Sequence, residues 1–185
     1  MEVLPGRIHV GEDAPADVPR YETVRDFLSD LSAAGEADVA LQAFDARYVA
    51  GESHLRSAVW HADRSIRRGE NVADRRAVEI LLYAAGRRQI DQAMRLGIGE
   101  GTTPVLVLIA GVPEENARDG TEDGAAVDAV ANRVRPLLGA YDAWESADPD
   151  RIASVFDVTD AERAATDAPL EELVRERVAL LDVEK

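Results

Sequence analysis

Apolar residues along this chain follow two spacings, one typical of strands and one typical of helices. A continuous apolar run at residues 104–110 (PVLVLIA) predicts a central strand that is buried on both faces. Shorter strands are expected at residues 7–10, 38–49 and 151–156. Apolar residues three or four apart predict helices over residues 21–34, 53–68, 74–85, 87–96, 125–138 and 169–183, the last being the C-terminal helix.

Glycine, proline and capping residues mark where these helices are expected to begin and end. Gly35, Gly69, Gly86 and Gly97 each follow a helical stretch, where a helix is expected to end. A capping box at residues 159–162 opens a further short helix, and Pro169 suits the first turn of the last one. Polar, acidic segments at residues 11–20 and 111–124 are expected to be loops. The pattern predicts an α+β fold in a single domain over residues 1–185, with a small mixed or antiparallel sheet packed with several helices.

Composition narrows the class of protein. Hydrophobic residues make up 46% of the 185 residues, enough for a core, but no run approaches the roughly 20 apolar residues of a membrane span. The first residues lack the basic and apolar regions of an export signal. Cysteine is absent, which excludes disulfides and thiolate metal sites. We expect a soluble, cytoplasmic protein without membrane contact.

The charge is strongly negative, with 36 acidic against 21 basic residues and a formal net charge of −15. Almost all bases are arginine, since the only lysine is Lys185. Such a surface indicates adaptation to a salt-rich cytoplasm, where screening removes most self-repulsion. The alternative is an acidic binding module at ordinary salt. Because the acids are spread along the chain, the halophilic interpretation is preferred.

No residue pattern indicates catalysis. His54 and His61 are seven apart on one expected helix, about 10.5 Å along its axis, which disfavours a shared zinc ion. We expect both to be partly exposed and His9 to be structural. The glycines of residues 97–101 follow a helix and precede a strand, the reverse of a dinucleotide-binding loop. No catalytic residue, metal or cofactor is expected.

Positive charge gathers in one window of the chain. Between residues 54 and 96 there are nine arginines against five acids, a net charge of +4. We call these nine the arginine island: Arg56, Arg64, Arg67, Arg68, Arg75, Arg76, Arg87, Arg88 and Arg95. It is either a contact for a polyanion or a set of helix-surface ion pairs, and charge alone leaves both open.

A salt-rich cytoplasm limits how the arginine island could bind a polyanion. Concentrated salt weakens phosphate neutralisation, so recognition of nucleic acid would rest on stacking and hydrogen bonds to unpaired bases. Arg88 and Gln89, at an expected helix start after Gly86, supply a guanidinium plane and an amide.

The same segment resembles a known family. Residues 71–90 (NVADRRAVEILLYAAGRRQI) are similar to the signature of the CGI/TPRKB family of KEOPS complex subunits, and the resemblance covers residues 38–110 and 151–183. Its core pattern is carried by Glu79, Leu81, Leu82, Ala85, Gly86, Arg88, Gln89 and Ile90. The family often has serine where Ala85 stands, and the acidic loop 111–124 looks like a local elaboration.

The resemblance implies an α+β, non-catalytic subunit. It implies that the chain binds the single-stranded CCA end of tRNA and a kinase-like ATPase, and through it a transferase, in threonylcarbamoyladenosine modification of tRNA. The candidate RNA-binding residues are Arg88, Gln89, Arg87, Gly86, Arg75, Arg64 and Arg68. Glu79 is expected to pair with Arg75 or Arg76, whereas Leu81, Leu82 and Ile90 are expected in the core.

The last helix is a candidate kinase-binding surface. The residues proposed for that contact are Leu173, Arg177, Val178 and Leu181. Ordinary packing of this helix on the rest of the protein is an equally weighted alternative. Two other functions stay open: a protein adaptor that activates the kinase-like subunit without contacting RNA, and a small-molecule enzyme with a carboxylate site.

Overall fold

The computed structural model describes residues 1–112 and 124–183. It has an α+β fold, as expected, with two compact units. The sheet unit comprises residues 1–46 and 98–146, and the helical unit comprises residues 47–97 and 147–185. The expected single domain over residues 1–185 stays a prediction. Most of the expected acidic loop, residues 113–123, lies outside the described residues.

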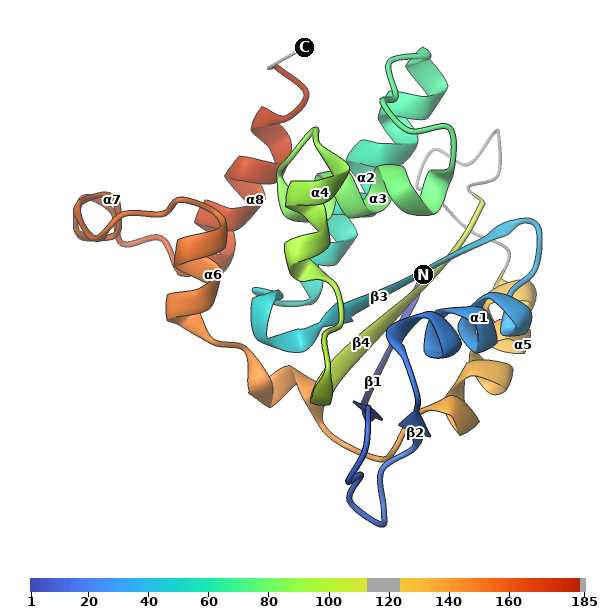
Figure 1. The fold of residues 1–185 in the computed structure, drawn as a ribbon. Coiled ribbons are helices and arrows are strands. Elements are labelled where there is room, and N and C mark those ends of the chain that lie inside the picture. The colour runs from blue at the N-terminus through green and yellow to red at the C-terminus, as the bar shows by residue number, and fades with distance from the viewer. Residues whose placement is uncertain (113–123, 184–185) are drawn as a thin grey trace. The chain divides into compact units, whose positions relative to one another are not determined.

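Four strands form the mixed sheet, in the order β2-β1-β4-β3 (Figure 1). They are β1 (Glu2–Val10), β2 (Arg20–Tyr21), β3 (Val39–Asp45) and β4 (Gly101–Gly111). β1 and β2 are parallel, and β4 runs antiparallel to both of its neighbours, β1 and β3. The apolar run predicted to be central is the middle of β4, where every side chain from residue 105 to residue 110 is buried.

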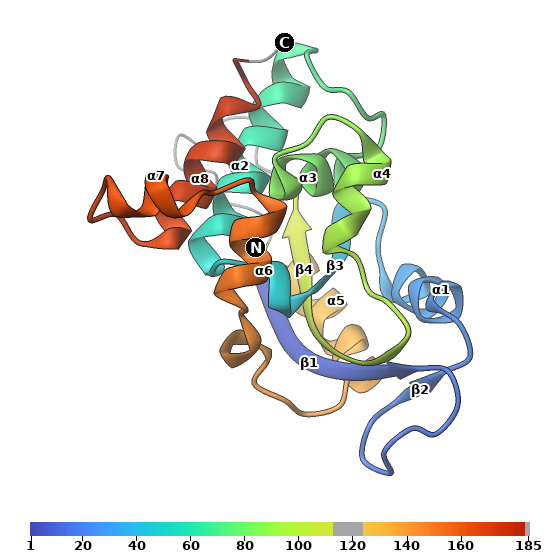
Figure 2. The same cartoon turned by 60° about the vertical axis from the view of Figure 1, so that its left-hand side comes forward.

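Two helices cover one face of this sheet, α1 (Val24–Ala34) and α5 (Gly124–Val134), and they lie side by side in both views (Figures 1 and 2). α1 begins at Thr23, whose side chain and that of Asp26 form a capping box. The core between helices and sheet includes Phe27, Leu31, Val127, Val130, Ile8, Val105, Val107 and Ile109. Alternate residues of β4 belong to this core, as the two-residue period of a strand requires.

The helical unit is built on α2 (Glu52–Arg68), which packs against α3 (Arg76–Ala85) and α8 (Leu170–Leu180). α2 ends at Gly69, whose φ of +66° is the left-handed conformation that glycine adopts most easily. The shorter helices are α4 (Ile90–Ala93), α6 (Pro149–Val155) and α7 (Asp160–Ala164). None of the helices in the described part of the chain is long and apolar enough to cross a bilayer.

The structure corrects several expected elements. Residues 151–156, expected as a strand, belong mostly to helix α6, because Asp148 caps its first turn and Pro149 stands at the first helical position. The expected helix over residues 87–96 is only α4 followed by a 3₁₀ turn, Met94–Leu96. The expected helix over residues 125–138 also gives way to a 3₁₀ turn, Arg135–Leu137, around Pro136.

Candidate functional site

The arginine island divides into paired and unpaired members. Five arginines bond to acids or backbone carbonyls of the helical unit: Arg56, Arg64, Arg76, Arg87 and Arg88. The other four are exposed, and their side chains have no ion pair or hydrogen bond within residues 1–112 and 124–183: Arg67, Arg68, Arg75 and Arg95. The ion-pair interpretation therefore holds for the five paired arginines, while a polyanion contact stays a prediction for the other four.

The backbone of the signature segment turns sharply after α3. Gly86 ends this helix with a φ of +59°, and the N–H groups of residues 86 and 87 bond to the carbonyls of Tyr83 and Leu82. A Cβ at Gly86 would lie 3.6 Å from the nearest atom of Arg177, an ordinary contact. The left-handed conformation, rather than lack of space, is therefore what favours glycine here.

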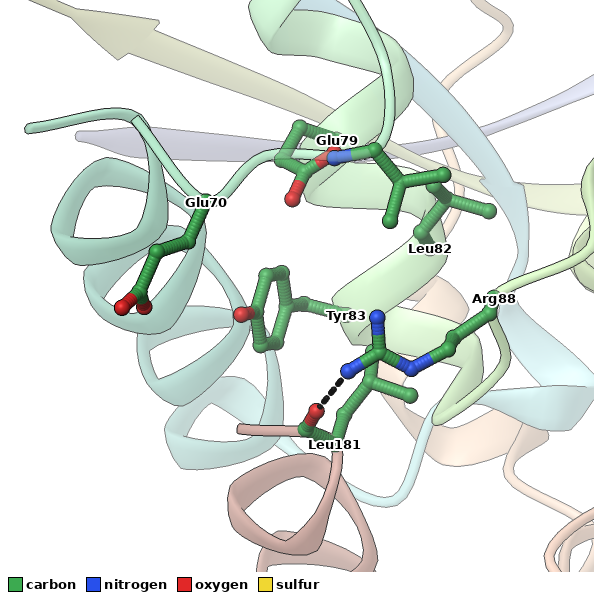
Figure 3. A pocket seen from close by; sticks show the side chains of 7 residues that line it. Glu70, Glu79, Leu82, Tyr83, Arg88 and Leu181 are labelled. Atoms are coloured by element: carbon green, nitrogen blue, oxygen red, sulfur yellow. Dashed lines mark hydrogen bonds between the residues drawn. The ribbon is translucent and has the colours of Figure 1, made fainter. Parts of the chain in front are cut away.

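The two arginines that follow point back toward the helical unit. Arg87 donates to the carbonyl of Val155 at 2.8 Å and to the carboxylate of Asp157 at 2.5 Å. Arg88 donates to the carbonyl of Leu181 at 2.6 Å (Figure 3), while its buried Nε has no partner. The signature arginines thus hold the segments around α6 and α8 against the end of α3.

The next residues face outward. Gln89 is exposed at the start of α4 and accepts a hydrogen bond from Gln92 at 2.7 Å. Ile90 and Met94 are 52% and 51% exposed, so the expectation that Ile90 lies in the core is wrong. Met94 follows Ile90 by four residues, and the side chain of Arg95 beside it is unpaired in the described chain. The outward face combines an amide, two apolar side chains and a cation.

Leu81 and Leu82 are buried, as expected, but Glu79 differs from expectation. Glu79 does not pair with Arg75 or Arg76. It is buried, and its carboxylate accepts hydrogen bonds from the backbone N–H groups of Val72 and Ala73, at 3.1 and 2.9 Å. It therefore fixes the loop that precedes α3.

Arg76 instead pairs with Asp63 of α2 through two hydrogen bonds of 2.6 and 2.9 Å. Sequence reasoning missed Asp63. The signal was present, because Asp63 stands four residues after buried Val59 on the apolar face of its helix.

A second cluster that the sequence did not reveal surrounds Asp182, directly after α8. Its carboxylate accepts a hydrogen bond of 2.6 Å from the hydroxyl of Tyr83. It also lies 2.8 Å from Nδ1 of His61 and 3.5 Å from Nη1 of Arg64. Burial opposes ionisation of Asp182, but the hydrogen bonds from Tyr83 and His61 outweigh it and hold its pKa below the usual value. Burial and this carboxylate together raise the pKa of Tyr83 to about 12.

Both helix histidines were expected to be partly exposed, and both are buried. His61 stacks on Tyr83. The Nε2 of His54 donates to the carbonyl of Ala84 at 2.7 Å, and its Nδ1 accepts the N–H of Ala50 at 3.3 Å. Burial lowers the pKa of His54 to about 4, so the ring is neutral. His9 is structural, as expected, since it bonds to Thr102 and to the carbonyl of Glu12.

The residues proposed for kinase contact lie mostly inside the helical unit. Leu173, Val178 and Leu181 are buried, and Arg177 donates to Glu162 at 2.6 and 2.8 Å. These positions favour the packing alternative for this face of α8. The exposed apolar residues at its end are Leu180 and Val183, 46% and 77% exposed.

A small hollow lies between Arg88, Tyr83, Glu79 and Glu70, with Leu181 at its edge (Figure 3). It has room for about one water molecule, too little for a substrate. Within the two described stretches, no three metal-ligating side chains come together.

Comparison with known proteins completes this description. No curated protein matches the chain. The model of one family, described as kinase binding protein CGI-121, matches residues 17–182 and so extends the sequence resemblance to nearly the whole chain. The chain therefore belongs to the CGI-121 family of kinase-binding proteins.

Proposed function

We propose that this chain is a non-catalytic subunit of the KEOPS complex, which binds a kinase-like ATPase and the single-stranded CCA end of tRNA. Through the ATPase it joins a transferase in threonylcarbamoyladenosine modification of tRNA. The observation that carries the proposal is the family match over residues 17–182, since this family is defined by kinase binding. The acidic, lysine-poor composition supports a salt-rich cytoplasm as the setting.

Exposed apolar residues support the helical unit as the kinase-binding part. Trp60 on α2 is 54% exposed, and the guanidinium of Arg64 lies 5.2 Å from the centre of its ring. Leu180 and Val183 are exposed at the end of α8, the helix that packs on α2. Tryptophan and arginine anchor many protein interfaces, and exposed apolar side chains beside them often mark an interaction surface. We assign the kinase contact to these exposed residues rather than to the buried face of α8.

The outward face of residues 89–95 supports the RNA contact. Unpaired bases bind by stacking on flat or apolar side chains and by hydrogen bonds to amides. Gln89 offers the amide, while Ile90 and Met94 offer apolar surface. The side chains of Arg75 and Arg68, two of the candidates from the sequence, are unpaired in the described chain and suit phosphates. Stacking and amide contacts persist in concentrated salt, where counterion release contributes little.

A second candidate is an adaptor that binds the kinase-like subunit without RNA. One observation favours it: Arg87 and Arg88 already donate to backbone carbonyls of their own chain. Their role in this candidate is to hold α6 and α8 in place.

Intact tRNA and tRNA trimmed of its CCA end separate the two candidates. We expect the full chain, in concentrated salt, to bind intact tRNA more tightly, and Gln89→Ala or Ile90→Asp to abolish most of that difference. Leu28→Asp is a matched control, since Leu28 is an exposed apolar residue on α1 of the sheet unit. Equal affinity of the parent for both tRNAs would exclude the CCA end as the contact, and binding to neither would leave only the adaptor.

The kinase contact is tested on the same chain by titration calorimetry with the kinase-like subunit. Leu180→Asp and Trp60→Ala are expected to weaken binding at least tenfold, as changes to interface anchors do. Leu28→Asp is expected to leave it unchanged. Binding unaffected by either helical-unit variant would move the kinase contact to another surface.

A further inference from the structure

Arg88 is a charged side chain whose hydrogen-bonding capacity is only partly used. One terminal nitrogen donates to the carbonyl of Leu181, whereas the buried Nε has no partner. A guanidinium has five N–H donors, and a carbonyl presents a single oxygen to them. A phosphate or a base edge would use more of these donors, and would do so with the geometry that arginine binds best.

The group that occupies Arg88 belongs to the end of α8. Figure 3 shows the guanidinium reaching the Leu181 carbonyl beside Tyr83. We call residues 181–183 the terminal turn. Besides the buried side chain of Leu181 and two backbone hydrogen bonds to the end of α8, it is held at Asp182, which receives hydrogen bonds from Tyr83 and His61 and lies close to Arg64. Val183, the last residue of the turn, is 77% exposed, whereas Leu181 is buried.

We propose that the terminal turn is an intramolecular competitor for Arg88, which must release the Leu181 carbonyl before it can bind RNA. This inference rests on the proposed RNA-binding function and adds its regulation. Asp182 sets the strength of the competition, because its bonds to α2 and α3 hold the turn in place. Weakening Asp182 frees Arg88, and stronger RNA binding follows.

The thermodynamic consequence has a definite sign. When a site can bind only in a minor, open state, its apparent affinity equals the affinity of the open state multiplied by the fraction of molecules that are open. A variant that favours the open state therefore binds RNA more tightly without any new contact. Loss of one hydrogen bond to a charged group changes such an equilibrium by roughly tenfold.

Tyr83→Phe is the sharpest test, because it removes only the hydroxyl that bonds to Asp182 and keeps the buried ring. We expect the full-length variant to bind a fluorescein-labelled tRNA transcript roughly three- to tenfold more tightly than the parent, by anisotropy. Asp182→Asn is expected to act in the same direction. Tyr21→Phe is the matched control, since its hydroxyl donates to the carbonyl of Leu137 in the sheet unit.

The double variant Tyr83→Phe/Arg88→Ala isolates Arg88. If the terminal turn competes for that side chain, the gain from Tyr83→Phe disappears once Arg88 is removed. Hydrogen exchange of residues 181–183 is expected to rise in Tyr83→Phe and not in Tyr21→Phe. Unchanged or weaker tRNA binding by Tyr83→Phe, in a chain whose Arg88→Ala variant does lose affinity, overturns the competition alone. Unchanged binding by Arg88→Ala instead overturns the RNA role of Arg88 itself.

Discussion

The sheet unit and the helical unit distribute polar and apolar residues in different ways. Among its described residues, the sheet unit encloses an apolar core with few buried polar side chains, namely His9, Asp45 and Thr103. The helical unit buries more of them: His54, His61, Asp63, Ser65 and Glu79. It also exposes more large apolar side chains, namely Trp60, Val72, Ile90, Met94, Leu180 and Val183.

This is the difference that we would expect between a scaffold and a recognition surface. Buried polar groups contribute less to stability than apolar ones, but they fix neighbouring segments in one arrangement. Exposed apolar side chains cost solubility unless a partner covers them. Both features occur together in the helical unit, around the segment that carries the family signature. The sheet unit has the pattern expected of a region selected for folding alone.

The largest effect is expected from breaking the buried ion pair of the helical unit. Asp63→Ala leaves Arg76 without its carboxylate at a site where the two side chains are only 10% and 17% exposed. We expect a loss of about 3 kcal/mol in the free energy of unfolding, measured by urea denaturation. In the sheet unit, Arg7 pairs with Asp17, which is 71% exposed, so Asp17→Ala is expected to cost less than about 1 kcal/mol.

Hydrogen exchange shows which elements the loss of the ion pair destabilises. Asp63→Ala is expected to speed exchange in α2 and α3 and to leave β4 protected. A double variant, Asp63→Leu with Arg76→Met, is expected to recover most of the loss because no charge stays buried. Equal destabilisation by Asp63→Ala and Asp17→Ala would contradict the contrast between the units.

The pH dependence of stability is the second test, and it depends on His54. Its pKa is about 4 in the folded protein against an ordinary 6.5, so the unfolded state takes up a proton first as the pH falls. The stabilising effect of the neutral ring is complete above pH 6.5 and is lost between pH 6.5 and 4. The loss amounts to about 3 kcal/mol. His54→Gln is expected to flatten this part of the curve of unfolding free energy against pH, and an unchanged slope would exclude His54 as its source.

Local sequence patterns predicted elements of both units. The apolar run of β4 occurs where expected, and α2 begins one residue before its expected range. α1 begins three residues later than expected, because Thr23 caps it. The expected strand at residues 151–156 was wrong because a short apolar run does not distinguish a strand from a helix. There the decisive signal was the Asp148-Pro149 helix start.

Long-range partners explain what the sequence could not predict at the candidate site. Arg88 and Tyr83 are far from the terminal turn in the sequence, and spacing gave no indication that both bond to it. Ile90 was expected in the core because a continuous helix over residues 87–96 would have turned it inward. The short α4 leaves it outside. The RNA-binding roles of Arg64, Arg68, Arg75, Arg87, Arg88 and Gln89 stay predictions.

The smallest expected effect concerns two adjacent threonines of the sheet unit. Thr103 is fully buried in β4 opposite Ile8, and its hydroxyl has no hydrogen-bond partner within the described residues. Thr103→Val keeps the shape and removes an unsatisfied polar group, so we expect a gain of about 1 kcal/mol in the free energy of unfolding. Thr102→Val is the control with the opposite sign, because the hydroxyl of Thr102 lies 2.9 Å from Nδ1 of His9 and this bond would be lost. A gain at Thr103 would show that the sheet unit tolerates more apolar character, as a scaffold should. A loss at Thr103 would mean that its hydroxyl has a partner, and that this unit too depends on buried polar contacts.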